Sequence, residues 1–111
     1  MIVCVDLDGT ISGAPDFYAA EMRGLLGAGH EVHVLTGDPQ PERVLGRLGL
    51  QRGRHYTCAA VVPRRGIAAF KVAYMREVGA THLVDNRKAN IRAARQAGFT
   101  GHWHAQPKEK P

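Results

Sequence analysis

Two carboxylates stand one residue apart, directly after the first apolar run of the chain. Asp6 and Asp8 follow residues 1–5, a run rich in β-branched side chains that predicts a buried strand. Residues i and i+2 of a strand share a face, so both carboxylates can be aimed at one point beyond the strand end. Like charges this close are unfavourable unless a cation or a shared proton offsets them. The pattern therefore favours a chemical site, although carboxylates that merely end a strand and cap a turn would give the same pattern.

Polar residues also follow two other strand-like runs. Thr36 comes after residues 31–35, and Asp85 with Asn86 comes after residues 81–84. Thr36 taken alone would be read as a strand-end or cap residue.

Lys71 interrupts an apolar pattern at helical spacing. It falls four residues after Ile67 and three before Tyr74, inside the apolar face of a helix predicted over residues 67–78. A buried lysine requires an anionic partner. The alternative is that its long stem carries the ammonium past the apolar edge to water.

Strand-like and helix-like segments alternate along the whole chain. Strands are predicted over residues 1–5, 31–35, 56–62, 81–84 and 99–103, and helices from residue 15 to the stop at Gly29, over 41–49, over 67–78 and over 88–97. This alternation predicts an α/β fold, a three-layer α/β/α Rossmann-like sandwich around a mainly parallel five-stranded sheet. Ligands bind such sheets beyond the carboxyl ends of the strands, where these polar residues lie. We expect a single domain over residues 1–104 and a loose polar tail over 105–111.

The order of these residues resembles that of the haloacid dehalogenase-like (HAD) hydrolase superfamily, most of whose members are magnesium-dependent phosphatases. The resemblance rests on a strand followed by Asp6-Leu7-Asp8-Gly9-Thr10, then Leu35-Thr36-Gly37, then Lys71, then Val84-Asp85-Asn86. It covers nearly the whole chain and implies a HAD-like core without a cap domain, because residues 11–14 and 37–66 hold no more than a linker, one helix and one strand.

The resemblance implies a role for each matched residue. Asp6 would attack phosphorus and Asp8 would serve as acid and then base, while Thr36 and Lys71 would complete the catalytic set. Substrate phosphate would meet Gly9, Thr10, Thr36, Gly37 and Lys71. Mg²⁺ would be held by Asp6, Asp8 (through its backbone carbonyl), Asp85 and Asn86, since Mg²⁺ prefers hard oxygen ligands.

Asn86 departs from the family pattern, in which many members carry a second Asp at this position. A neutral amide can still offer its oxygen to a metal, but with less attraction. Capping of the helix over 88–97 is an equally good interpretation of Asn86. Asn90, one helical turn further on, would support the site or be exposed. Asp85-Asn86-Arg87 also resembles the Asp-Asp-Arg of the deoxyribonucleotidase-like branch, a weak hint toward nucleotide substrates.

Composition sets the remaining expectations. The chain has 111 residues, a formal charge of +5 and two cysteines, Cys4 and Cys58, which we expect to be reduced thiols in the cytoplasm. No apolar run reaches the roughly 20 residues of a membrane span. His102 and His104 would share a strand face as a metal pair, but we interpret them as ordinary edge-strand residues.

The predicted function is hydrolysis of a phosphomonoester by a monomer or small homo-oligomer. The uncapped site and the basic charge tilt the substrate toward a nucleotide or a nucleic-acid terminal phosphate. A HAD-fold binding or regulatory module with weakened catalysis is the alternative, and a receiver-like phosphoacceptor domain is a third.

Overall fold

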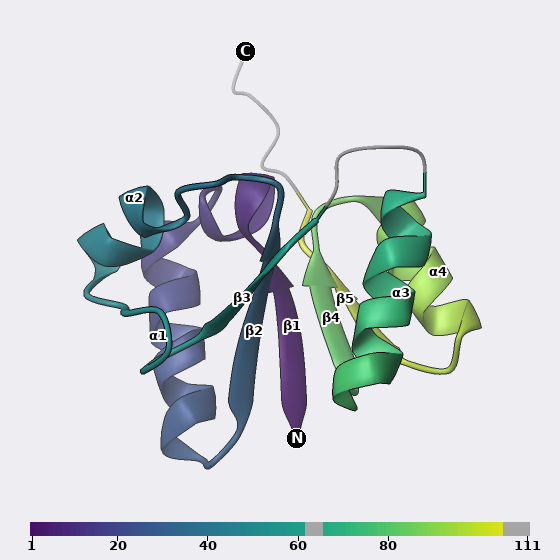
Figure 1. Ribbon diagram of the computed structural model, residues 1–111, viewed down its shortest axis with the longest axis horizontal. Coiled ribbons are helices and arrows are strands. Elements are labelled where there is room, and N and C mark those ends of the chain that lie inside the picture. The colour runs from purple at the N-terminus through teal and green to yellow at the C-terminus, as the bar shows by residue number, and fades with distance from the viewer. Residues whose placement is uncertain (62–65, 106–111) are drawn as a thin grey trace.

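The computed structural model describes residues 1–61 and 66–105, and within these ranges five strands form one parallel sheet. The strand order is β3-β2-β1-β4-β5, so the first strand of the chain lies at the centre (Figure 1). The strands are β1 (Ile2–Asp6), β2 (Glu31–Thr36), β3 (Thr57–Ala60), β4 (His82–Asp85) and β5 (Thr100–Trp103). Because β2 and β4 flank β1, the carboxyl ends of these three strands meet at one edge of the sheet.

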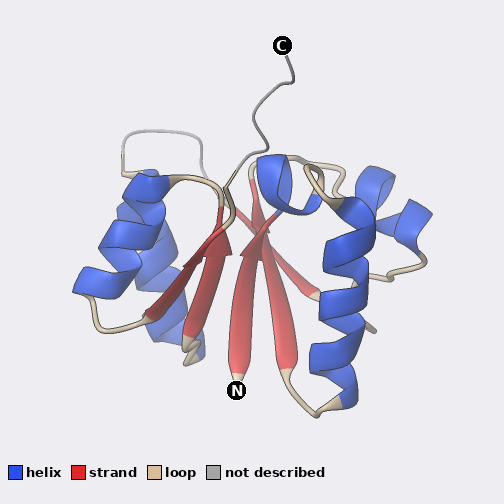
Figure 2. Cartoon of the chain, turned by 180° about the vertical axis from the view of Figure 1, so that it is seen from behind, coloured by secondary structure: helices blue, strands red, loops and turns tan. Residues whose placement is uncertain are grey.

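Helices cover both faces of the sheet, two on each. Figures 1 and 2 show α1 and α2 on one side and α3 and α4 on the other. The helices are α1 (Pro15–Gly27), α2 (Glu42–Leu45), α3 (Ile67–Val78) and α4 (Lys88–Gln96), with short helical turns at Leu7–Ile11 and Gly46–Leu48. The predicted three-layer α/β/α sandwich with a parallel sheet is confirmed.

The central strand is buried on both faces, which is why it reads as an unbroken apolar run. Val3 and Val5 pack with Met22 of α1 in one apolar cluster, whereas Cys4 packs with Met75 of α3 in the other. Burial raises the pKa of the Cys4 thiol to about 12, so this thiol stays protonated at neutral pH. Cys4 and Cys58 are both free, as expected for reduced cysteines.

Several element boundaries differ from the sequence prediction. The helix expected over 41–49 is reduced to the four residues of α2 and a 3₁₀ turn, consistent with the low helix propensity of Gly46. The strand expected over 56–62 is shorter because β3, at the sheet edge, pairs with β2 over Thr57–Ala60; Val62 lies outside the described residues. Asp6, Thr36 and Asp85 each form the last residue of a strand rather than following it.

Two glycines test how tightly the layers pack. A Cβ at Gly101 of β5 would lie 2.9 Å from Ile91 Cγ2 on α4, whereas a Cβ at Gly24 of α1 would meet nothing within 4 Å. We expect Gly101→Ala to lower the free energy of unfolding by about 1–3 kcal/mol through overpacking. Gly24→Ala should raise it by up to about 1 kcal/mol. Denaturant titration of both variants would measure the difference, and equal effects would contradict the packing of α4 on β5.

Candidate functional site

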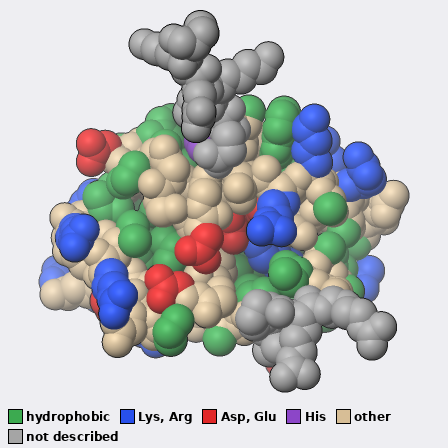
Figure 3. Space-filling view, turned by 90° about the horizontal axis from the view of Figure 1, so that it is seen from above, with side chains coloured by type: hydrophobic (Ala, Val, Ile, Leu, Met, Phe, Trp, Pro, Cys, Tyr) green, Lys and Arg blue, Asp and Glu red, His purple; other side chains and the backbone are tan. Residues whose placement is uncertain are grey.

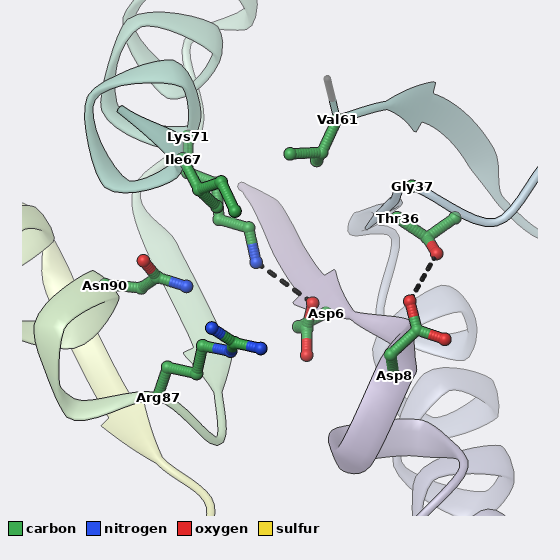
Figure 4. Close-up of a pocket in the computed structure, with 9 residues that line it drawn as sticks. All are labelled: Asp6, Asp8, Thr36, Gly37, Val61, Ile67, Lys71, Arg87 and Asn90. Carbon is green, nitrogen blue, oxygen red and sulfur yellow. Dashed lines mark hydrogen bonds and ion pairs between the residues drawn. The ribbon is translucent and has the colours of Figure 1, made fainter. Parts of the chain in front are cut away.

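The carboxyl ends of β1 and β2 and the first turns of α3 and α4 enclose a cavity of about 190 Å³ (Figure 4). It is lined by Asp6, Asp8, Thr36, Gly37, Val61, Ile67, Lys71, Arg87 and Asn90. The three-layer fold brings residues that are up to 84 positions apart to one place, since the cavity spans Asp6 to Asn90. Figure 3 shows acidic side chains gathered in the middle of this face with a basic side chain beside them.

A buried lysine joins the first and fourth strands. Lys71 Nζ lies 2.9 Å from Asp6 Oδ1 and 2.6 Å from Asp85 Oδ2, and Lys71 is 3% exposed. Lys71 therefore does not extend to water, and its apolar surroundings require the anionic partners that it has. Two of its three ammonium donors are used, so Lys71 holds the Asp6 carboxylate in a fixed direction.

Asp6 is held at its other oxygen as well. Thr10 Oγ1 donates to Asp6 Oδ2 at 3.2 Å, and Thr10 itself is fully buried. The pKa of Asp6 is raised from 3.8 to about 6, chiefly because burial disfavours its charged form; Lys71 lowers this pKa and Asp85 adds to the rise. A carboxylate with this pKa is ionised for the most part at neutral pH but is far less stabilised by water than an exposed one.

Asp8 leaves the strand and reaches the cavity from the turn Leu7–Ile11. The backbone there is not helical at Asp8 (φ −74°, ψ 116°) or at Gly9 (φ 80°). The exposed Asp8 carboxylate accepts a hydrogen bond from Thr36 Oγ1 at 2.8 Å, and Thr36 Oγ1 in turn accepts from the Asp38 backbone N–H at 3.0 Å. Thr36 thus orients the second carboxylate beside the first.

Gly9 meets two requirements that a larger residue would not. Its positive φ favours glycine, and a Cβ at this position would lie 2.5 Å from the terminal amide of Asn86. This close approach places the Asn86 side chain directly over the Asp6–Asp8 turn.

Asn86 does not cap α4. The N-cap of α4 is Arg87, which makes no side-chain capping hydrogen bond. With its amide nitrogen directed at the turn, Asn86 donates to Asp6 Oδ2 at 3.0 Å and to the Asp8 carbonyl at 3.3 Å. Of the two interpretations left open by the sequence, the structure contradicts the helix cap.

Asp85 and Asn90 are buried and contact each other, and Asp85 also contacts Lys71. Asp85 is fully buried, and besides Lys71 it accepts from Asn90 Nδ2 at 3.0 Å and from the Arg87 backbone N–H at 2.9 Å. Asn90 is 4% exposed, so it is not a surface residue. Asp85 faces Lys71 and not the cavity, and its assignment as a metal ligand stays a prediction.

The donor set for Mg²⁺ can be tested on the geometry of Asn86. If its amide oxygen replaced the nitrogen, three oxygens would converge, with Asn86 at 3.0 Å from Asp6 Oδ2 and 3.3 Å from the Asp8 carbonyl. Adjacent ligands of an octahedral Mg²⁺ lie about 3 Å apart, because its bonds are about 2.1 Å long. Asp6, Asp8 and Asn86 therefore fit Mg²⁺. In residues 1–61 and 66–105, no group of three or more His, Cys, Asp or Glu side chains is arranged to hold a metal.

The structure brings most of the predicted site residues together, but only some of them line the cavity. Asp6, Asp8, Thr36, Gly37 and Lys71 line the cavity, whereas Gly9 and Thr10 do not, and Thr10 hydrogen-bonds Asp6 instead. Arg87 was not among the predicted site residues, and its guanidinium points into the cavity toward Asp6 (Figure 4). Its position next to Asn86 in the sequence was the signal for it.

The histidines near the end of the chain have separate partners. His102 stacks on His82 with ring centroids 5.5 Å apart, while His104 meets Tyr18 edge-on at 5.2 Å. Neither pair adds to the cavity.

No protein-family model matches the chain, and comparison with curated proteins finds no match. The resemblance to the HAD superfamily therefore rests on the residues themselves. Among the described residues, no helix has the length and apolar character needed to cross a membrane.

The raised pKa of Asp6 has a consequence for stability in metal-free protein. Between pH 3.8 and about 6 the folded chain holds the Asp6 proton more tightly than the unfolded chain does. The contribution of Asp6 thus favours folding below about pH 4, and stability is lost as the pH rises through 6. We expect Asp6→Asn to remove this loss, so that the variant exceeds the wild type by about 1–3 kcal/mol at pH 7.5 and matches it near pH 4. Chemical denaturation in EDTA at both pH values would measure this.

Glu77→Gln on the exposed side of α3 is the matched control, and its effect should be equal at the two pH values. Adding Mg²⁺ at pH 7.5 should stabilise the wild type and not Asp6→Asn, because the variant lacks the carboxylate that would hold the ion. A wild-type advantage at pH 7.5 without Mg²⁺ would contradict the burial cost at Asp6.

Proposed function

We propose that the chain is a Mg²⁺-dependent phosphomonoester hydrolase that works through an aspartyl-phosphate. The observation that carries the proposal is Asp6, a carboxylate fixed at both oxygens by Lys71 and Thr10, in a cavity that a second carboxylate, Asp8, also lines. A fixed nucleophile next to a separate acid-base group is the arrangement that covalent phosphoryl transfer requires.

Each carboxylate has a distinct task in the proposed reaction. An Asp6 oxygen attacks phosphorus while the bond to the leaving oxygen breaks, and protonated Asp8 gives that oxygen its proton. The Asp8 carboxylate then takes a proton from water, which attacks the aspartyl-phosphate and releases phosphate and free Asp6. The Thr36 hydroxyl orients Asp8 in both steps through its 2.8 Å hydrogen bond.

The charge of the site supports a divalent cation. Two cations line the cavity among the described residues, and Lys71 is already paired with Asp6 and Asp85, which leaves Arg87 to meet a phosphate. A phosphate dianion entering this site would be repelled unless further positive charge were present. Mg²⁺ held by Asp6, the Asp8 carbonyl and Asn86 would supply that charge and polarise the phosphoryl group.

The substrate class is proposed from the open site and the net charge, and the cellular compartment from the cysteines. The described segments between β1 and α1 and between β2 and α3 contain no cap over the cavity. An uncapped site admits a large substrate, and the net charge of +5 favours a polyanion such as a nucleotide or a nucleic-acid end. We propose a cytoplasmic protein, since two free thiols fit a reducing compartment.

The rival function is a regulatory module of the same fold that binds phosphate or metal without turnover, and Asn86 in place of a carboxylate is the observation that favours it. A receiver-like domain is contradicted by the topology, because flavodoxin-like receivers have the strand order 2-1-3-4-5 and this sheet has 3-2-1-4-5.

The first test of the enzyme hypothesis is hydrolysis of an aryl phosphate. We expect activity that requires Mg²⁺ and disappears in Asp6→Asn, with Asp8→Asn lowering kcat by at least about 100-fold because the leaving oxygen loses its proton donor. Steady-state assays with and without EDTA would measure this. Equal activity in Asp6→Asn would refute the mechanism, and binding of phosphate without turnover by the wild type would favour the regulatory module.

The second test concerns Arg87 and the phosphate group itself. Lys71 is committed to two carboxylates, so the exposed guanidinium of Arg87 is the group we expect to meet the phosphoryl oxygens. Arg87→Gln should raise the inhibition constant of inorganic phosphate about 10–100-fold, the value of a charge-assisted hydrogen bond.

Arg76→Gln is the control, since it removes the same charge from the far end of α3. Arg87→Lys should recover part of the phosphate affinity. Phosphate inhibition in Arg87→Gln that equals that in Arg76→Gln would contradict a role for Arg87.

A further inference from the structure

Another cavity, of about 240 Å³, is lined by residues of α4 and β5. Lys88, Arg92 and Arg95 lie at i, i+4 and i+7 of α4, so they form one stripe, and Trp103 of β5 lines the same cavity. These four residues are named the α4–β5 surface. Within the described part of the chain, no Asp or Glu oxygen pairs with its three cations, whereas Arg52 pairs with Glu42 and Lys71 with two carboxylates.

The segment that carries this surface has an excess of positive charge. Residues 1–85 contain nine Lys or Arg and nine Asp or Glu, so they are formally neutral. Residues 86–105 contain four basic residues and no acidic one. A positive potential that is local and unpaired attracts a polyanion more strongly than the same charge spread over the surface.

Trp103 adds an aromatic ring to these cations. It is 45% exposed even with Lys88 Nζ over its ring at 4.5 Å from the centroid. Its Nε1–H donates to the Asn86 carbonyl at 3.0 Å, which fixes the indole next to the residue that contacts Asp6. An exposed indole leaves apolar surface in contact with water. Because the hydrogen bond holds the ring in place, its free face is suited to stacking on a flat ligand.

Gly101 lets the stripe lie close to the sheet. Because Gly101 has no side chain, the stem of Arg95 lies against β5, and Arg95 Nη2 donates to the Gly101 carbonyl at 2.9 Å. The guanidinium is thereby held against β5 at Gly101, two residues before Trp103 on the same strand.

We infer that the α4–β5 surface binds a single-stranded nucleic acid whose terminal phosphate enters the Asp6 cavity. This inference rests on the proposed function for the fate of the phosphate, but not for the binding. Proteins hold single strands by stacking bases on aromatic rings while cations follow the phosphates, which is the combination found here. An acidic polypeptide would pair with the cations but has no flat base to cover the indole.

Binding can be measured without any reaction. Trp103 is the only tryptophan of the chain, so its fluorescence reports on this surface alone. We expect an unphosphorylated oligothymidylate of about eight nucleotides to quench it. Polyglutamate, a polyanion without bases, should not. Quenching by polyglutamate equal to that by the oligonucleotide would overturn the inference in favour of an acidic polypeptide, and no quenching by either would overturn it outright.

Variants separate stacking from charge, with the anisotropy of a labelled oligothymidylate as the readout. Trp103→Ala should raise Kd about 5–100-fold, and Trp103→Phe, which keeps a ring, should recover much of the affinity. Arg92→Gln with Arg95→Gln should raise Kd at least about tenfold and reduce the salt slope by about 1.4. Arg76→Gln is the charge control. Affinities of all variants equal to that of Arg76→Gln would overturn the inference.

Hydrolysis distinguishes the two proposals. The ratio of kcat/KM for a terminally phosphorylated oligothymidylate to that for an aryl phosphate should fall at least about tenfold in the Arg92→Gln, Arg95→Gln variant. A wild type that binds the oligonucleotide but hydrolyses neither substrate would refute the proposed function and leave the α4–β5 surface intact. A wild type that hydrolyses the aryl phosphate but does not bind the oligonucleotide would refute the role of the α4–β5 surface and leave the proposed function intact.

Discussion

The contact of Lys71 with Asp6 and Asp85 is the interaction on which the site depends. It joins α3 to two neighbouring strands through a lysine that is almost fully buried, at 2.9 and 2.6 Å. Removing Lys71 would leave two buried carboxylates without their cation, which costs several kcal/mol, so this lysine fixes the ends of both strands. Stability alone does not require this arrangement, since an apolar core of the same size would serve equally well. Its position at the end of the central strand is what would make it useful to the proposed reaction.

The strand order explains why the network lies at this edge of the sheet. With β1 between β2 and β4, one edge receives Asp6, Thr36 and Asp85 as the terminal residues of three adjacent strands. The chain crosses from one face to the other between β3 and β4, and this crossing brings α3 and its lysine over β1. The crevice at such a switch point is where open α/β sheets bind ligands. The cavity is therefore a consequence of topology, and its chemistry a consequence of which side chains end the strands.

The sequence predicted the fold class and most of the cavity, because both follow from periodicity and from residue types at strand ends. It did not separate residues that face a substrate from residues that support them, since that depends on side-chain direction. That Thr10 meets phosphate and Asp85 meets metal stays a prediction, and the structure adds that Thr10 hydrogen-bonds Asp6 while Asp85 contacts Lys71, Asn90 and a backbone N–H. Asn86 was ambiguous for the same reason, and the structure places its amide so near Gly9 that an added Cβ would lie 2.5 Å from it.

The charged side chains of the described residues form two regions of opposite sign. Among the described residues, Asp6 and Asp8 make the centre of the carboxyl-end face anionic, with the guanidinium of Arg87 beside them, whereas the flank along α4 is cationic. Under the proposed function, a free phosphate would gain little from the centre without a metal, whereas a phosphate attached to a longer polyanion would also be attracted by the flank. Asn86 stands between the two regions, with its side chain on Asp6 and its carbonyl on Trp103. An amide here in place of a second carboxylate weakens the hold on a cation, and it also lowers the negative charge that an approaching phosphate must pass. Asn86 is the observation that favours a regulatory module, but an enzyme acting on a polyanion would also tolerate an amide at this position.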